Sequence, residues 1–269
     1  MRNKFFCAKK RRKFSIFAMH TQAKRVIKLF SQRLAVTLWG RADFTRFILL
    51  SRSRTGSNML ASLLNSHPHV QVDGEVLRRL AGQDHRDILA AVFAKQPRHI
   101  QAKGFKFFYY HPLDGNPAEV WQSLVNIPEL RVIHLKRRNI LRTLVSRKIA
   151  GDQGVWLEKT NDSRDKTAKN SVLFTVEELK SGFEKTRNWE NIAEETFSRH
   201  AYLSIYYEDI VAEIQDSSQR ISQFLSVPFL PPQIALRRQN PEALRMLISN
   251  YDQMKTAFMD TEWQSFFSE

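Results

Sequence analysis

Apolar residues along the chain gather in short runs that turn residues separate. The runs are 47–50 (FILL), 70–72 (VQV), 101–111 (QAKGFKFFYYH), 130–135 (LRVIHL) and 201–210 (AYLSIYYEDI). Runs of this length and composition are typical of buried strands. The chain is therefore expected to contain at least five strands.

Helical spacing of apolar residues occurs between and after these runs. It extends over 59–64, 77–95, 141–150, 175–197 and 211–225. Strands that alternate with helices predict an α/β fold of three layers, in which helices flank a central, mainly parallel sheet. The 269 residues are enough to bury a sizeable core for such a domain.

The turn after the first strand, 51–58 (SRSRTGSN), is rich in hydroxyl groups and arginine. A helix follows at once and ends near His67 and Pro68. A strand, turn and helix in this order direct backbone N–H groups and the positive end of a helix dipole at one point, which suits a phosphate or a sulfate. Arg54 adds a guanidinium that can bond two anionic oxygens. The same pattern also suits an ordinary capped junction between a strand and a helix.

The order of residues in this turn differs from that of nucleotide-triphosphate loops, which place a Lys after their second glycine. The turn resembles the 5′-phosphosulfate loop of the sulfotransferases that use 3′-phosphoadenosine 5′-phosphosulfate (PAPS). The resemblance covers about residues 46–255 and implies a P-loop-like fold, with PAPS as co-substrate. It also implies that the 5′-phosphosulfate is held by Arg54, Thr55, Gly56, Ser57 and Asn58.

A second anion site is predicted after the fourth run. Arg138 follows the strand and Ser146 lies about two helical turns further on, at roughly 3.6 residues per turn. An Arg with a hydroxyl suits an isolated phosphate monoester. The spacing is similar to that of the sulfotransferase 3′-phosphate site, and the family's late basic loop implies a contribution from Arg237 or Arg238, of which Arg238 is preferred.

Sulfuryl transfer to an alcohol needs a base that takes the hydroxyl proton. Glu75 follows the second strand, and by resemblance to carbohydrate-type and bacterial sulfotransferases it is the predicted base, with Asp73 as a rival. Lys106 and His111 of the third strand are further catalytic candidates that could reach the sulfuryl oxygens. Either could instead be structural. Arg54 is expected to stabilise the transition state as well as to bind the nucleotide.

Charge is concentrated in the first part of the chain. Residues 1–46 hold thirteen Lys and Arg against one acidic residue, Asp43, so most of the net charge of +15 lies there. We divide the chain into a basic extension, 1–45, and a sulfotransferase domain, 46–269. The extension could pack on the domain, lie peripherally on an anionic membrane, or act in targeting. The mild charge of the rest gives no reason to expect a nucleic-acid partner.

Cysteine content and hydropathy bear on whether the protein has a metal site or a membrane-spanning segment. The chain has one cysteine, Cys7, and no spacing of His, Asp or Glu that indicates a metal site. No apolar run approaches the roughly 20 residues that cross a bilayer. We expect the protein to be cytoplasmic. Peripheral contact with the inner surface of the membrane is a further possibility.

The resemblance implies a sulfotransferase that moves a sulfuryl group from PAPS to a hydroxyl of a carbohydrate or glycolipid acceptor. Two alternatives remain open at this point: a P-loop kinase-like phosphotransferase, and a non-catalytic membrane- or nucleic-acid-binding protein on a degenerate sulfotransferase fold. The sequence leaves the acceptor and the oligomeric state open.

Overall fold

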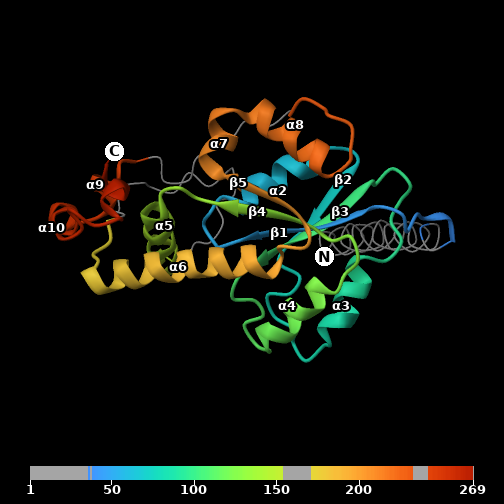
Figure 1. Ribbon diagram of the computed structural model, residues 1–269, viewed down its shortest axis with the longest axis horizontal. Helices are drawn as coiled ribbons and strands as arrows, with labels where there is room; N and C mark the ends of the chain where they lie inside the picture. Colours follow the sequence, from blue (N-terminus) through green and yellow to red (C-terminus); the bar gives the residue numbers. More distant parts are fainter. Residues whose placement is uncertain (1–35, 37, 154–170, 233–241, 269) are drawn as a thin grey trace, which may run out of the picture.

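Five strands of the described residues form a parallel sheet at the centre of the molecule (Figure 1). The computed structural model describes residues 36, 38–153, 171–232 and 242–268. The sheet has the order β2-β3-β1-β4-β5, and every neighbouring pair runs parallel. The strands are β1 (Thr45–Ser51), β2 (Val70–Asp73), β3 (Ala102–Phe108), β4 (Arg131–Lys136) and β5 (Ala201–Tyr206). The predicted α/β fold with a central parallel sheet is confirmed.

Helices cover both faces of this sheet (Figure 1). Helices α2, α7 and α8 pack on one face, and α3, α4 and the end of α6 pack on the other. The helices are α2 (Ser57–Asn65), α3 (His85–Val92), α4 (Pro117–Val125), α5 (Ile140–Gln153), α6 (Val176–Thr196), α7 (Tyr207–Ala212), α8 (Ile214–Phe224), α9 (Leu244–Leu247) and α10 (Tyr251–Ala257), with a 3₁₀ turn η1 (Gln264–Phe267).

Strand β1 lies in the middle of the sheet, and its sequence reflects that position. Phe47 and Leu49 pack with the α2 layer, whereas Ile48 and Leu50 pack with the α3–α4 layer. A parallel strand that is covered on both faces is apolar throughout, which explains the continuous FILL run. The loop that follows β1 is therefore anchored on a rigid, fully buried strand.

A third apolar cluster lies beyond the carboxyl ends of the strands. It joins α5, the first half of α6, and the C-terminal elements α9, α10 and η1. Phe183 of α6 contacts the rings of Phe258, Trp263 and Phe266. This cluster fixes α5, which carries one of the predicted phosphate ligands.

Several of the predicted elements are wrong in extent. The helix expected over 77–95 begins only at His85, because the backbone turns at Ala81 (φ 50°) and Gly82 (φ 81°) and Asp114 accepts the N–H groups of Leu80 and Ala81. The strand expected over 201–210 ends at Tyr206, and the helix expected over 211–225 is two helices that meet at Glu213.

Candidate active site

The carboxyl ends of all five strands meet at one edge of the sheet, where open α/β sheets bind ligands. The segments that follow the strands bring the predicted site residues to this edge: 52–56 after β1, 74–75 after β2, 109–111 after β3, 137–139 after β4, and the start of α7 after β5. The site is thus assembled from segments that are far apart in sequence, from residue 52 to the start of α7 at Tyr207.

The loop between β1 and α2 holds two residues in the left-handed conformation. Arg54 has φ 69° and Gly56, which precedes α2, has φ 99°. A Cβ at Gly56 would lie 2.4 Å from Cδ2 of Tyr207, so the position has no room for a side chain. Thr55 is buried and its hydroxyl donates to the carbonyl of Arg52 over 2.8 Å, which closes the loop. Thr55 therefore offers a ligand its backbone N–H more readily than its hydroxyl proton.

Helix α2 presents its first turn to the same edge. Among the described residues no side chain caps its N-terminus, and its first turn contains no acidic residue. The first N–H groups of a helix have no partner within the helix, and the dipole makes this end positive. The end of α2 therefore suits an anion, as the sequence pattern indicated.

Arg54 and Ser146 are in direct contact. The Nε of Arg54 donates to the Oγ of Ser146 over 2.9 Å, although the residues are 92 positions apart. Ser146 lies on α5 and is almost fully buried. The sequence analysis assigned these residues to two separate anion sites, and the structure shows that one residue from each predicted site contacts the other.

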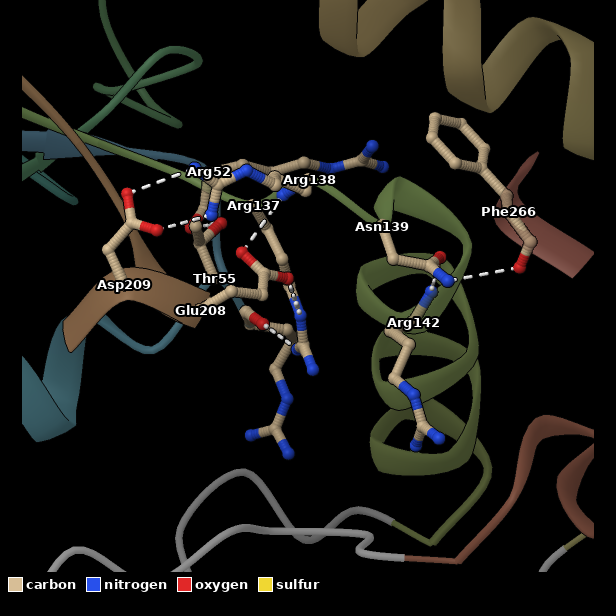
Figure 2. Close-up of polar contacts among 10 residues, drawn as sticks. Arg52, Thr55, Arg137, Arg138, Asn139, Arg142, Glu208, Asp209 and Phe266 are labelled. Carbon is tan, nitrogen blue, oxygen red and sulfur yellow. Dashed lines mark hydrogen bonds and ion pairs between the residues drawn. The ribbon is translucent and has the colours of Figure 1, made fainter. Parts of the chain in front are cut away.

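Arg138 points towards α7 (Figure 2). Its Nη1 and Nη2 donate to the two carboxylate oxygens of Asp209 over 2.5 and 3.1 Å, and its guanidinium lies 4.4 Å from the centre of the Tyr206 ring. The neighbouring Arg137 instead turns to the β1–α2 loop, where Nη1 donates to the carbonyl of Arg54 over 3.3 Å. The sequence singled out Arg138 only, and Arg137 is the arginine that contacts the loop.

Asn139 fixes the start of α5 beside these arginines. Its Oδ1 accepts the N–H of Arg142 over 3.2 Å, and its Nδ2 donates to the carbonyl of Phe266 over 3.0 Å (Figure 2). The second bond ties the start of α5 to the C-terminal turn η1. Asn139 therefore turns the chain into the helix, as predicted, and also joins it to a distant segment.

Glu75 lies in a chain of polar contacts with the loop. The Nζ of Lys106 donates to Oδ1 of Asn58 over 2.5 Å and to Oε1 of Glu75 over 3.2 Å. Lys106 is 8% exposed, so this ammonium is held inside the protein. The rival carboxylate, Asp73, is bound over 2.6 Å to the Nζ of Lys103, which lies nearer the start of β3. Of the two carboxylates, Glu75 is the one linked to the loop.

His111 lies next to Glu75. Its Nε2 is 3.8 Å from Oε2 of Glu75, and its side chain is 1% exposed. Burial lowers the pKa of His111 to about 4, although Glu75 raises it, so the ring is neutral at neutral pH. The structure thus brings together Asn58, Glu75, Lys106 and His111.

Arg52 connects the β1–α2 loop to helix α6, a role that the sequence analysis did not predict. It is 5% exposed and donates to the carbonyl of Gly182 over 3.3 Å and to the hydroxyl of Thr186, both on α6. Burial lowers its pKa to about 10. No local pattern could have revealed this role, because the partners lie about 130 residues away.

Some expectations lie outside the described residues or concern absences. Arg237 and Arg238 fall in 233–241, and residues 1–35 of the basic extension are also not described. Within the described residues no group of three or more His, Cys, Asp or Glu side chains is arranged to hold a metal ion. The same part of the chain contains no helix with the length and hydropathy needed to cross a bilayer.

The fold of this chain is similar to that of a solved sulfotransferase. A solved sulfotransferase from Alicyclobacillus acidocaldarius superposes with a TM-score of 0.50, over 80% of this chain and 91% of that chain, at 12% identity. At this identity the likeness concerns the fold. It agrees with the order of strand, loop and helix on which the resemblance in sequence rested.

Sequence relatives point to the same family. Nodulation protein H of Rhizobium tropici is 26% identical over 240 residues, which are 82% of this chain and 92% of that protein. Nodulation protein H of Rhizobium meliloti (strain 1021) is 26% identical over 239 residues, with 82% and 94% covered. No family model matches the chain. Taken with the fold, these relatives support a sulfotransferase family and a sulfotransferase enzyme.

Proposed function

We propose that the enzyme transfers a sulfuryl group from PAPS to a hydroxyl of a carbohydrate or glycolipid acceptor, with Glu75 as general base. The observation that carries this proposal is the chain of contacts from Asn58 through Lys106 to Glu75. It puts a carboxylate beside the anion-binding loop, and transfer of a sulfuryl group to an alcohol needs that pair of features.

The nucleotide is assigned across the two adjoining anion sites. Arg54, Thr55, Gly56, Ser57 and Asn58 hold the 5′-phosphosulfate, and the contact between Arg54 and Ser146 supports a ligand that spans both sites. The positive φ of Gly56 and its close approach to Tyr207 make a backbone cradle that a Cβ would fill. The uncapped end of α2 supplies N–H groups and the helix dipole.

The 3′-phosphate is assigned to Arg138 and Ser146, with Arg238 as a further ligand. A guanidinium has five N–H donors, and Asp209 accepts two of those of Arg138. Arg138 thus retains donors for a phosphate while Asp209 holds the side chain at the end of β4. Arg137, which already contacts the loop carbonyl of Arg54, adds positive charge between the two sites.

Glu75 takes the hydroxyl proton as the acceptor oxygen attacks sulfur. The new O–S bond forms as the S–O bond to the 5′-phosphate breaks, and negative charge develops on the leaving oxygen of the bisphosphate. Arg54 and the N–H groups at the start of α2 are fixed on that side, so they stabilise the transition state more than the ground state. Lys106 must leave Glu75 for the sulfuryl oxygens, which frees the carboxylate to accept a proton.

Calorimetry with 3′,5′-bisphosphoadenosine tests the assignment of the nucleotide site. We expect Arg54→Ala and Arg138→Ala each to weaken binding about 10- to 100-fold, since a hydrogen bond to a charged group contributes roughly 1.5–3 kcal/mol. Arg46→Ala is the matched control, because Arg46 lies at the other end of β1, away from the loop. Unchanged affinity in both variants would remove the site assignment.

A turnover assay with PAPS and candidate glycan and glycolipid acceptors tests the reaction itself. Sulfate transfer that requires PAPS supports the donor assignment. Binding of ATP with magnesium, together with no binding of the bisphosphate, would contradict it. Failure with every hydroxylated acceptor while the bisphosphate still binds would leave the nucleotide site in place and overturn the acceptor class.

A further inference from the structure

His111 is fixed in place immediately after β3. The turn 108–111 is closed twice: the N–H of His111 donates to the carbonyl of Phe108 over 2.9 Å, and the N–H of Phe108 donates to Nδ1 of His111 over 3.3 Å. The imidazole packs against Phe107, Phe108 and Tyr110, with ring centres 5.0–6.0 Å away. The ring therefore has little freedom to turn.

These contacts determine where the proton of the ring lies. A backbone N–H can only donate, so Nδ1 of His111 must be the unprotonated acceptor. In the neutral ring the proton is then on Nε2. The ring stays neutral because burial lowers its pKa to about 4, and the positive charges of Arg78 and Lys106 act in the same direction.

The Nε2–H group of His111 has no hydrogen-bond partner among the described residues. It faces Oε2 of Glu75 at 3.8 Å, just outside hydrogen-bond range. A buried donor without a partner costs roughly 1–3 kcal/mol, so such a group calls for an explanation. The other carboxylate oxygen, Oε1, is held by Lys106, and Nε of Arg78 lies 3.9 Å from Oε2 on the solvent side.

We infer that His111 is a positioning residue for Glu75: its Nε2–H closes onto Oε2 and leaves Oε1 to take the proton of the acceptor hydroxyl. This inference rests on the proposed function, in which Glu75 is the base. It excludes His111 itself as the base, because Nδ1 is occupied by a backbone N–H and Nε2 already carries a proton. His111 keeps that proton throughout the reaction, and the hydroxyl proton ends on Oε1.

The role has a consequence for the pH dependence of turnover. A hydrogen bond to a carboxylate favours its ionised form and lowers its pKa. The acidic limb of the pH–rate profile therefore lies lower than it would with Lys106 withdrawn and no donor on Oε2. The other polar groups that border this pair are the amide of Asn58 and the guanidinium of Arg78.

The test compares His111→Gln, which keeps a neutral N–H donor, with His111→Leu, which does not. We expect His111→Leu to lower kcat about 10- to 100-fold and to move the acidic limb to higher pH, since one hydrogen bond to a carboxylate is lost. His111→Gln should recover most of that loss and restore the limb. Both variants should bind 3′,5′-bisphosphoadenosine as the wild type does, which also shows that they are folded.

Two results would overturn the inference. One is a His111→Gln enzyme as slow as His111→Leu, which would require the imidazole itself. The other is a His111→Leu enzyme with the wild-type rate and pH profile. Should the variants not fold, nitrogen-15 NMR of the wild-type imidazole decides: a neutral ring protonated on Nε2 from pH 6 to 8 supports the role, and the other tautomer or an imidazolium refutes it.

These failures differ from failure of the proposed function. If the wild type transfers no sulfate from PAPS, the function falls whatever the variants do. If the wild type is active, Glu75→Gln is inactive and the two His111 variants are indistinguishable from wild type, only the role of His111 falls.

Discussion

Lys106 holds one oxygen of the Glu75 carboxylate, and His111 lies near the other. If Glu75 is the base, Glu75→Gln keeps the shape of the side chain but cannot take a proton. We expect kcat to fall at least about 100-fold, as for loss of a general base. The bisphosphate should bind with unchanged affinity in calorimetry. Asp73→Asn is the control, and a larger loss there than in Glu75→Gln would transfer the role to Asp73.

Gly56 is the second residue on which the site depends. An alanine there would combine φ 99° with a Cβ 2.4 Å from the Tyr207 ring. We expect Gly56→Ala to lower the free energy of unfolding by about 1–3 kcal/mol and to weaken bisphosphate binding, measured by urea titration and calorimetry. Gly74→Ala is the control, since no atom lies within 4 Å of its added Cβ. Normal binding of the bisphosphate by Gly56→Ala would show that the loop does not need a glycine at this position to bind the nucleotide.

At the scale of elements, α6 is the support on which the β1–α2 loop rests. Arg52, the first residue of the loop, is held by the Gly182 carbonyl and the Thr186 hydroxyl of this helix. Thr186→Val has nearly the same shape but offers no oxygen. We expect it to destabilise the protein by about 1–3 kcal/mol, the cost of an unsatisfied buried polar group. Urea unfolding would measure this, with Thr196→Val near the end of the same helix as control. An effect no larger than that of the control would mean that Arg52 does not depend on α6.

The elements predicted most accurately are those whose pattern of apolar residues matches the faces that are buried in the fold. The FILL run became β1 because both faces of a central parallel strand are covered. The helix expected over 77–95 failed in its first part because Asp114, from another segment, binds the turn at Leu80 and Ala81. Apolar spacing carries no information about such a partner.

For the whole molecule, we expect two buried histidines and the partly buried Glu190 to dominate the pH dependence of stability between about pH 4.5 and 6.5. Burial lowers the pKa of His134 to about 3 and that of His111 to about 4, and it raises the pKa of Glu190 to about 7. Between about pH 4.5 and 6.5 the unfolded chain binds two extra protons on the histidines, and the folded chain binds one on Glu190. The unfolded state thus binds one proton more, so stability falls as pH falls, by roughly 1.4 kcal/mol per pH unit.

Glu190→Gln makes this prediction specific. Without the opposing carboxyl group the difference becomes two protons, so the slope should be about twice as steep, roughly 2.7 kcal/mol per pH unit. Urea unfolding at pH 5, 5.5 and 6 would measure both slopes. A Glu190→Gln protein with the wild-type slope would show that Glu190 is ionised in the folded state over this range.

The basic extension, residues 1–45, bears on whether the whole protein associates with a membrane. Strand β1 begins at the edge of the sheet opposite the candidate site, and Leu38 and Trp39 just before it are largely exposed. We expect a protein that starts at residue 36 to bind the bisphosphate normally and to lose binding to phosphatidylglycerol vesicles in a sedimentation assay, because most of the positive charge is removed. Equal vesicle binding by both proteins would exclude the extension as the membrane contact.

The sequence by itself determined the five strands and their alternation with helices, and it predicted an anion-binding turn at residues 54–58, because these depend on spacings within a few residues of chain. It also predicted the pair of Arg138 and Ser146, which are separated by about two helical turns. Only the tertiary structure decided that Arg54 meets Ser146, that Arg138 faces Asp209, and that Lys106 and His111 bracket Glu75. The physical reason is that parallel strands distant in sequence end at one edge, and packing, not local pattern, selects which side chains meet there.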